Sequence, residues 1–229
     1  MEVLVFASRK GGSGKSTLAA HLAAHAHKPS RRCLLIDTDP QGSLALWHRL
    51  RLADGASDDL PLKTVHRNIA DAVKEAKRDG VDWAFIDTAP NMSASVTDAV
   101  RTATLVVVPC RPGVFDLESV KDTIAFARQA RKPYAVVING AAPKRQDVES
   151  RAVAQARESL TALHVPVWGG QITQRANFSA ALAEGEGAKE YDSASSAATE
   201  ISRLWLAIER TVRAIHSMRE AGGSRKAAA

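Results

Sequence analysis

Cysteine and aromatic residues are scarce in this chain, and long apolar runs are missing. Cys33 and Cys110 are its two cysteines, and each stands beside an apolar run. Such sparse usage excludes a disulfide scaffold and fits a reducing compartment, so we expect both to be core residues. No segment approaches the ~18 apolar residues of a membrane span, and glycines interrupt the amino-terminal apolar stretch before it reaches signal-peptide length. We therefore expect a cytoplasmic protein that is neither exported nor membrane-spanning.

The remaining composition is that of one folded α/β domain. Of the 229 residues, 45% are hydrophobic, 24% charged and 5% aromatic, which excludes collagen-like and disordered chains. This length suffices for one substantial core, and no internal repeat or second domain is visible. We predict a single domain over residues 1–220 and a flexible basic tail, AGGSRKAAA, over residues 221–229.

Positive charge is concentrated in two windows. Lys and Arg number 31 against 25 Asp and Glu, a net charge of +6. Residues 128–157 hold seven basic and two acidic side chains, and residues 200–229 hold six basic and three acidic ones. Clustered cations displace counterions from a phosphate backbone, so the windows fit a nucleic-acid partner. They fit the solvated faces of surface helices equally well, and charge alone leaves both interpretations open.

Short aliphatic runs alternate with helix-like segments. The predicted strands, each stopped by Asp, Pro or Gly, are residues 3–7, 33–39, 83–90, 105–112 and 134–140. Helices are predicted at about residues 15–27, 68–79, 92–102, 116–131, 146–163 and 195–219. Residues 50–63 are expected to form a polar loop. The alternation predicts a doubly wound α/β fold, a mostly parallel sheet with helices on both faces and ligands at the carboxyl ends of its strands.

A glycine-rich loop follows the first predicted strand directly. Residues 9–17 read RKGGSGKST and lead into a predicted helix. The glycines let backbone N–H groups converge on phosphate oxygens, and the helix amino terminus adds partial positive charge. Lys15 is placed to bridge the β and γ phosphates, and the Ser16 hydroxyl is placed to bind Mg²⁺. The sequence thus predicts a P-loop NTPase whose loop residues Gly11, Gly12, Ser13, Gly14, Lys15, Ser16 and Thr17 bind the nucleotide.

The loop departs from the general phosphate-loop pattern in an informative way. Arg9 stands where that pattern begins with glycine, and Lys10 adds a second lysine. The run KGGSGKST resembles the deviant Walker A box of the ParA and MinD superfamily of ATPases, in which the early lysine reaches across a dimer interface to the partner's phosphates. The resemblance implies that Lys10 takes this role and belongs, with Lys15, to the catalytic and nucleotide-binding residues.

Three aspartates at predicted strand ends extend the resemblance. Residues 37–42, DTDPQG, resemble the family's switch I, which implies that Asp39 orients or activates the attacking water and that Asp37 lies close to the magnesium shell. Residues 87–90, DTAP, resemble the Walker B and switch II segment, which implies that Asp87 holds Mg²⁺ through a water. Aspartates at such positions also cap helices or close turns, and for each one alone that alternative stays open.

Later segments match the same family along nearly the whole chain. VVVPCRPGVFDLESV resembles the partition-ATPase segment with paired prolines, although a strand-to-helix turn and cap explain Pro112 and Asp116 as well. VVING places Asn139 where family members hydrogen-bond adenine, and a turn cap is again the alternative. Residues 172–187 resemble the family's loop and helix near the base and the dimer surface. The match is closest to small ParA proteins that lack an amino-terminal helix-turn-helix domain. We expect that this chain has no room for such a domain before its first strand.

The function that this resemblance implies is DNA partition. We expect an ATP hydrolase that uses ATP and Mg²⁺, forms a homodimer with ATP, binds duplex DNA without sequence preference and associates with the nucleoid. An adaptor or ParB-like activator of unknown identity is the further expected partner. Nonspecific binding needs cations that face phosphates, and the candidates, for which ordinary surface charge is the alternative, are Arg175, Arg203, Arg210 and Arg213.

Two other functions compete with this expectation. A MinD-like ATPase would use residues 201–220 as a basic amphipathic membrane anchor, and Leu204, Ile208, Val212 and Ile215 have the required spacing. A final helix packed on the sheet has the same pattern, and we expect packing instead of membrane contact. A metabolic P-loop enzyme is the third possibility, but the two cysteines form no iron-sulfur ligand pattern, and a small-molecule kinase does not need the second lysine.

Overall fold

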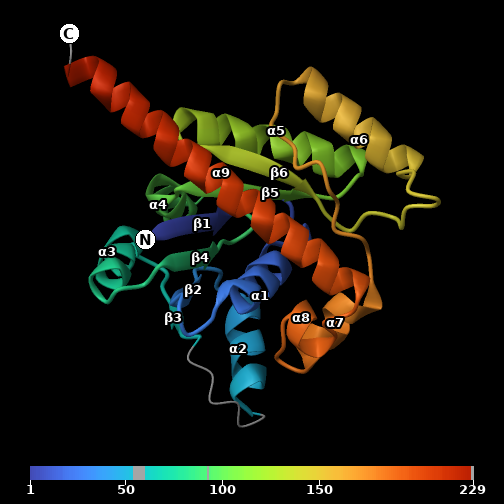
Figure 1. Ribbon diagram of the computed structural model, residues 1–229, viewed down its shortest axis with the longest axis horizontal. Coiled ribbons are helices and arrows are strands. Elements are labelled where there is room, and N and C mark those ends of the chain that lie inside the picture. The colour runs from blue at the N-terminus through green and yellow to red at the C-terminus, as the bar shows by residue number, and fades with distance from the viewer. Residues whose placement is uncertain (54–59, 92, 228–229) are drawn as a thin grey trace.

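Six parallel strands form the centre of the computed structural model, which describes residues 1–53, 60–91 and 93–227 (Figure 1). The strand order is β3-β2-β4-β1-β5-β6. The strands are β1 (Glu2–Phe6), β2 (Cys33–Asp37), β3 (Leu62–Thr64), β4 (Trp83–Asp87), β5 (Leu105–Cys110) and β6 (Tyr134–Ile138). All neighbours run parallel, so every carboxyl end lies at one edge of the sheet. This is the predicted doubly wound P-loop arrangement.

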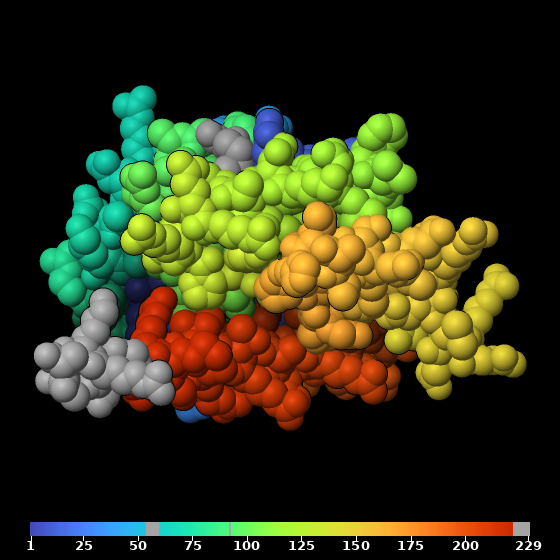
Figure 2. Space-filling model, turned by 90° about the horizontal axis from the view of Figure 1, so that it is seen from above, coloured from blue at the N-terminus to red at the C-terminus, as the bar shows by residue number. Residues whose placement is uncertain are grey.

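Helices cover both faces of the sheet. They are α1 (Lys15–Ala26), α2 (Ser43–Ala53), α3 (Ile69–Arg78), α4 (Ala94–Thr102), α5 (Val114–Gln129), α6 (Arg151–Ala162), α7 (Ala176–Ala183), α8 (Ala188–Tyr191) and α9 (Ser196–Ala227). The residues of α1, α2 and α7–α9 pack with Leu4 and Phe6 of β1, whereas those of α3–α6 pack with Val3 and Val5. Strand pleating explains this division, because successive side chains point to opposite faces. Figure 2 shows α9 along one side of the molecule and α5 along the other.

The segment predicted as a polar loop contains parts of two regular elements. Residues 50–53 belong to α2, and residues 62–64 form β3; residues 54–59 lie outside the described part. The prediction was wrong here because both elements give a weak signal. The helix α2 buries only Leu44 and Trp47, and β3 is a three-residue edge strand.

Two helix boundaries also differ from the prediction. The helix α6 begins at Arg151 instead of residue 146, because Gln146 and Asp147 have positive φ angles of 49° and 62° and the Ser150 hydroxyl accepts the first-turn N–H of Val153. The helix α9 crosses the sheet diagonally and stays helical to Ala227, within the segment predicted as a flexible tail (Figure 1). Gly222 and Gly223 stand within this last stretch and disfavour a helix, so local propensity does not explain the continuation. That residues 1–220 form one folding unit stays a prediction.

Candidate nucleotide site

The loop between β1 and α1 has the backbone of a phosphate cradle. Gly12 and Gly14 have φ angles of +71° and +100°, a region that favours glycine. A Cβ on Gly14 would lie 2.0 Å from the Nδ2 atom of Asn139, so the position has no room for another side chain. Gly14 is also the N-cap of α1 and brings no side chain to the first helical amides. These N–H groups therefore remain available to an anion.

A cavity of about 550 Å³ opens above this loop at the carboxyl edge of the sheet. Its predicted lining residues are Gly11, Gly12, Gly14, Lys15, Ser16, Thr17, Asp39, Asn139 and Arg175. The cavity is also lined by residues to which the sequence motifs assign no individual role, among them Gln41, Ser43, Arg111, Gly140, Thr173, Gln174 and Phe178. Gln41 and Arg111 lie inside the matched motifs, so their proximity to the predicted aspartates and prolines was the available signal. A volume of this size accommodates a nucleotide.

Lys15 projects from the first turn of α1 among buried acids. Its side chain is buried, and burial lowers its pKa, while the charges of Asp87 and Asp39 oppose that shift. The ammonium thus lies in a poorly hydrated place where it gains from an additional negative group. Phosphate oxygens in the cavity would supply that charge.

Asp87 ends β4 in the least solvated part of the site. It is fully buried, and neither carboxylate oxygen accepts a hydrogen bond within ordinary limits. Burial raises its pKa to about 7, although the nearby Ser16 side chain favours the charged form. A buried carboxylate without partners is costly, and a hydrated cation between Ser16 and Asp87 would remove that cost. Oxygen groups of this kind fit Mg²⁺.

The described residues contain no cluster of three or more His, Cys, Asp and Glu side chains that would hold a metal by themselves. Mg²⁺ usually keeps several waters and binds through few protein groups together with substrate phosphates. The pair of Ser16 and Asp87 agrees with that mode of binding, so the residues present fit a nucleotide-bound magnesium ion.

The two switch-like aspartates have different surroundings. Asp37 lies beside Asp87 in strand register, but its oxygens accept the backbone N–H groups of Asp39 and Ala45 at 3.0 and 2.9 Å. Burial raises its pKa, and these two hydrogen bonds oppose the rise. Asp39 instead lines the cavity, with one oxygen accepting the N–H of Gln41. Asp37 therefore shapes the loop and the start of α2, while Asp39 can face the ligand; a role of Asp37 near magnesium stays a prediction.

Asn139 and the segment that follows form the far wall of the cavity. The Asn139 Nδ2 group donates to the carbonyl oxygen of Ser13 at 2.7 Å. Residues 172–175 continue this wall, and Ala141 pairs with Thr173 in a parallel bridge beyond β6. The predicted Asn139 thus meets the phosphate loop itself, and its contact with adenine stays a prediction.

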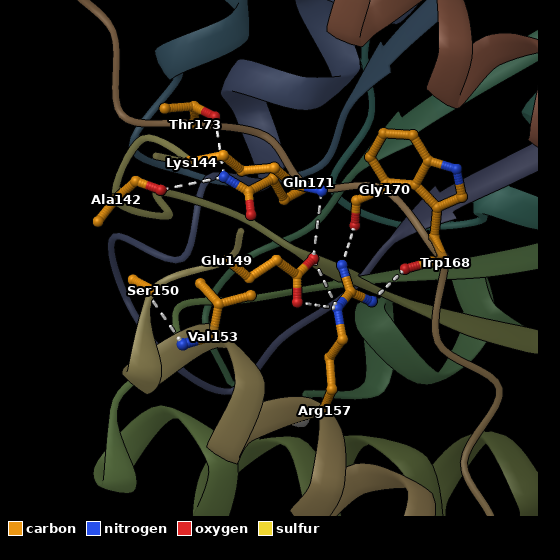
Figure 3. Close-up of polar contacts among 10 residues, drawn as sticks. All are labelled: Ala142, Lys144, Glu149, Ser150, Val153, Arg157, Trp168, Gly170, Gln171 and Thr173. Carbon is orange, nitrogen blue, oxygen red and sulfur yellow. Dashed lines mark hydrogen bonds and ion pairs between the residues drawn. The ribbon is translucent and has the colours of Figure 1, made fainter. Parts of the chain in front are cut away.

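A guanidinium network supports this wall from outside (Figure 3). Arg157 of α6 donates through Nε to both oxygens of Glu149 at 3.0 and 2.8 Å, and through Nη1 and Nη2 to the carbonyls of Trp168 and Gly170. The hydrogen bond with Arg157 is the main reason why the pKa of Glu149 is lowered. Gln171 continues the network to Ala142 and Thr173. Arg157, counted in the basic window, therefore holds this wall together, and no local sequence pattern identifies that role.

Lys10 lies at the edge of the phosphate loop, outside the nucleotide cavity of its own chain. The cavity lining drawn from the described residues includes Lys15 but not Lys10. The Lys10 ammonium instead stands 5.7 Å from the centre of the Phe115 ring on α5. That Lys10 reaches the phosphates of a partner chain stays a prediction.

The four arginines predicted to bind DNA fall into two groups. Arg175 pairs with Glu200 of α9 over 2.9 Å and lines the nucleotide cavity. Arg203, Arg210 and Arg213 are exposed along α9. The geometry brings these three onto one helix, and Arg175 lines a second pocket together with Arg203 while its own charge is paired with Glu200.

The apolar stripe of α9 belongs to the core. Leu204, Trp205, Ile208 and Val212 are buried, and Ile215 packs against them. The Trp205 ring meets Trp83 of β4 with centroids 4.7 Å apart. These side chains are therefore used in packing on the sheet, as we expected. Within the part of the chain that the structure describes, no helix combines the length and apolarity needed to cross a membrane.

Comparisons with known proteins agree with this geometry. Residues 4–188 match the model of the CobQ/CobB/MinD/ParA nucleotide binding domain. The chromosome-partitioning ATPase Soj of Thermus thermophilus is 32% identical over 154 residues, 56% of this chain and 62% of Soj. The maintenance of carboxysome distribution protein A of Gloeobacter kilaueensis is 34% identical over 123 residues, 53% of this chain and 55% of that protein. The chain thus matches little more than half the length of these relatives.

The fold has a solved counterpart at low sequence identity. The cell division ATPase MinD of Pyrococcus furiosus superposes with a TM-score of 0.74 at 20% identity, covering 92% of this chain and 99% of MinD. At this identity the likeness concerns the fold alone.

Proposed function

Since this chain belongs to the CobQ/CobB/MinD/ParA nucleotide-binding domain family, we propose that it is a ParA-like, magnesium-dependent ATPase. Its ATP-bound homodimer binds duplex DNA without sequence preference and drives the partition or positioning of a plasmid, chromosome or protein cargo. The names of its relatives, a chromosome-partitioning ATPase and a carboxysome distribution protein, support partition or positioning as the class of function.

One observation carries the ATPase part of the proposal. Buried Lys15 lines the cavity beside a glycine loop with open amides, and its charge interacts with the buried, unpartnered carboxylate of Asp87 beneath the cavity. The amides and Lys15 bind and orient the phosphates. Ser16 and Asp87 would hold a hydrated Mg²⁺, which would supply charge neutralisation of the phosphoryl group. Asp39 orients the attacking water from the cavity wall. The neighbouring chain's copy of Lys10 adds positive charge next to the γ-phosphoryl group, where negative charge develops during hydrolysis.

Exposed cations on α9 support the DNA part. Arg203 and Arg210 are two helical turns apart and so share a face, and Arg213 is one turn further on. No ion pair involves these three among the described residues, so their charge is available to phosphates. Arg175 is half-neutralised by Glu200 and serves DNA only if that pair opens. Binding of this kind would place the protein on the nucleoid, and an adaptor of ParB-like function would trigger hydrolysis.

The decisive experiment measures the oligomeric state. We expect light scattering to report a monomer with ADP and a dimer with ATP and Mg²⁺, and only the dimer to retard a random-sequence duplex. The Lys15→Ala variant is the matched control and should stay monomeric throughout. A chain that remains monomeric with ATP, or that binds DNA equally with ADP, would contradict the proposal.

A further inference from the structure

Phe115 is an aromatic side chain that the fold leaves almost entirely in water. It is 80% exposed, and its neighbour Val114 is 81% exposed, at the start of α5. Single exposed apolar residues need no explanation. This one carries a contact, however, because the Lys10 ammonium lies 5.7 Å from its ring centre. That distance lies within the range of a cation–π interaction.

The backbone beside Lys10 is fastened to the same helix. Arg9 forms an ion pair with the Asp122 carboxylate, and its N–H donates to the Thr123 hydroxyl at 3.3 Å. Both partners belong to α5, so Lys10 starts from a fixed point relative to Phe115. Its long side chain retains freedom of its own.

Lys10 differs from the other cations that stand over rings. Arg31 also pairs with Glu209, Arg51 with Glu190, and Arg128 donates to a tyrosine hydroxyl. The Lys10 ammonium has the Phe115 ring as its sole partner within the described residues, while the Lys10 backbone N–H donates to the Ser8 hydroxyl. A single weak contact favours one position of the lysine side chain but is easily broken.

We propose that Phe115 is a positioning residue for Lys10. The ring holds the ammonium at the rim of the phosphate loop in the unassembled chain, and Lys10 leaves it when the lysine reaches the phosphates of a second copy. The inference rests on the proposed function, because the second step requires the ATP-bound dimer. An exposed cation–π contact favours the held position by about two- to five-fold. A phosphate, which carries full charge, outcompetes it.

The first step is tested without nucleotide. Lysines are labelled by reductive ¹³C-dimethylation, which keeps their charge, and the Lys10 signal is assigned with Lys10→Arg. A proton above a ring is shielded, so we expect this signal upfield of exposed lysines, lost in Phe115→Leu and kept in Phe115→Tyr. Val114→Ala is the neighbouring control and should leave it unchanged. A Lys10 signal that is identical in the native chain and in Phe115→Leu would overturn the contact. Phe115 and Val114 are exposed, so their substitution does not put folding at risk, and Lys10→Arg keeps a long cationic side chain at its half-buried position.

The second step is tested with ATP and Mg²⁺ in the Asp39→Ala background, which should accumulate the dimer. We expect the Lys10 shift to disappear on assembly. Phe115→Leu should dimerise at a concentration about four- to 25-fold lower, because both copies of Lys10 must leave their rings, and Phe115→Tyr should restore the native value. If the upfield shift of the Lys10 signal persists in the dimer, or if Phe115→Leu dimerises at the native concentration, Lys10 does not leave the Phe115 ring on assembly and this step is wrong. If ATP produces no dimer at all, the proposed function fails, and the nucleotide-free spectra still decide the contact.

Discussion

The side-chain amide of Asn139 is joined to the carbonyl oxygen of Ser13 by a 2.7 Å hydrogen bond across 126 residues of sequence. It connects the end of β6 to the middle of the phosphate loop. The same amide fills the space beside Gly14. The shape of the loop therefore depends on a strand two positions away in the sheet.

Gly14→Ala should damage the loop in both fold and function. A new Cβ would meet the Asn139 amide at 2.0 Å in a backbone with φ +100°, and we expect a loss of about 1–3 kcal/mol in the free energy of unfolding. Gly11→Ala is the control, because its Cβ would meet nothing within 4 Å and its φ is not positive. Urea denaturation compares them, and equal stability of the two variants would contradict the packing described.

Substitution of Lys15 should affect ATP binding, whereas substitution of Lys10 should affect dimer formation. Lys15→Ala removes a buried cation from the phosphate site and should weaken ATP binding by about 2–5 kcal/mol, at least ~30-fold. Lys10→Ala should leave ATP binding by the monomer nearly unchanged and reduce dimer formation and hydrolysis. Calorimetry and light scattering give the two readouts. Unaltered ATP affinity in Lys15→Ala would remove this residue from the site.

The two switch aspartates should separate catalysis from stability. Asp39→Ala should still bind ATP, hydrolyse it slowly and accumulate as a dimer, because its carboxylate lines the cavity. Asp37→Ala leaves the N–H groups of Asp39 and Ala45 without their acceptors and should cost about 1–3 kcal/mol of stability per unsatisfied group. Phosphate release and urea denaturation measure these effects. Normal turnover of Asp39→Ala would exclude its catalytic role.

His21 should make the fold sensitive to acid. Its ring is buried in α1 against Phe178 and accepts the N–H of Ala188, and burial lowers its pKa from 6.5 to about 4. The unfolded chain thus binds more protons between pH 4 and 6.5, so stability is present above pH 6.5 and is lost as the pH falls toward 4. The expected loss is about 2–3 kcal/mol.

His21→Gln, which keeps an acceptor but does not titrate, is the comparison for this effect. Urea denaturation of both proteins from pH 4 to pH 7 isolates the histidine from the carboxylates that titrate in the same range. The free energy of unfolding should fall more steeply with acid in the native chain. Parallel curves would show that His21 contributes nothing.

Charge reversal on α9 should affect DNA and spare the nucleotide. Arg203→Glu together with Arg213→Glu should weaken DNA binding by the ATP-bound dimer and flatten its salt dependence by about one logarithmic unit of slope per lost phosphate contact. ATP affinity should not change, because neither residue lines the nucleotide cavity among the described residues. DNA affinity that stays high and insensitive to salt would place the DNA surface elsewhere.

Local apolar patterns in the sequence were sufficient to predict most of the strands and helices. The aliphatic runs around Val5, Ile86 and Val107 are buried on both faces of the parallel sheet, as their continuity predicts. The elements that escaped prediction, α2, β3 and the four-residue α8, bury little apolar surface of their own. The carboxyl-terminal helix was found from its stripe, but only its packing against Trp83 shows that this stripe meets the sheet.

The sequence by itself determined where the phosphate loop lies and which strands flank it, because glycine spacing and apolar periodicity are local properties of a chain. Only the tertiary structure decided which partners the charged groups have. Both oxygens of Asp37 accept backbone N–H groups, and the carboxylate of Asp87 has no partner. Arg157 binds backbone carbonyls of the cavity wall, and the Lys10 ammonium lies over the Phe115 ring. The physical reason is that burial and pairing fix the state of a charge, and both depend on residues far away in sequence.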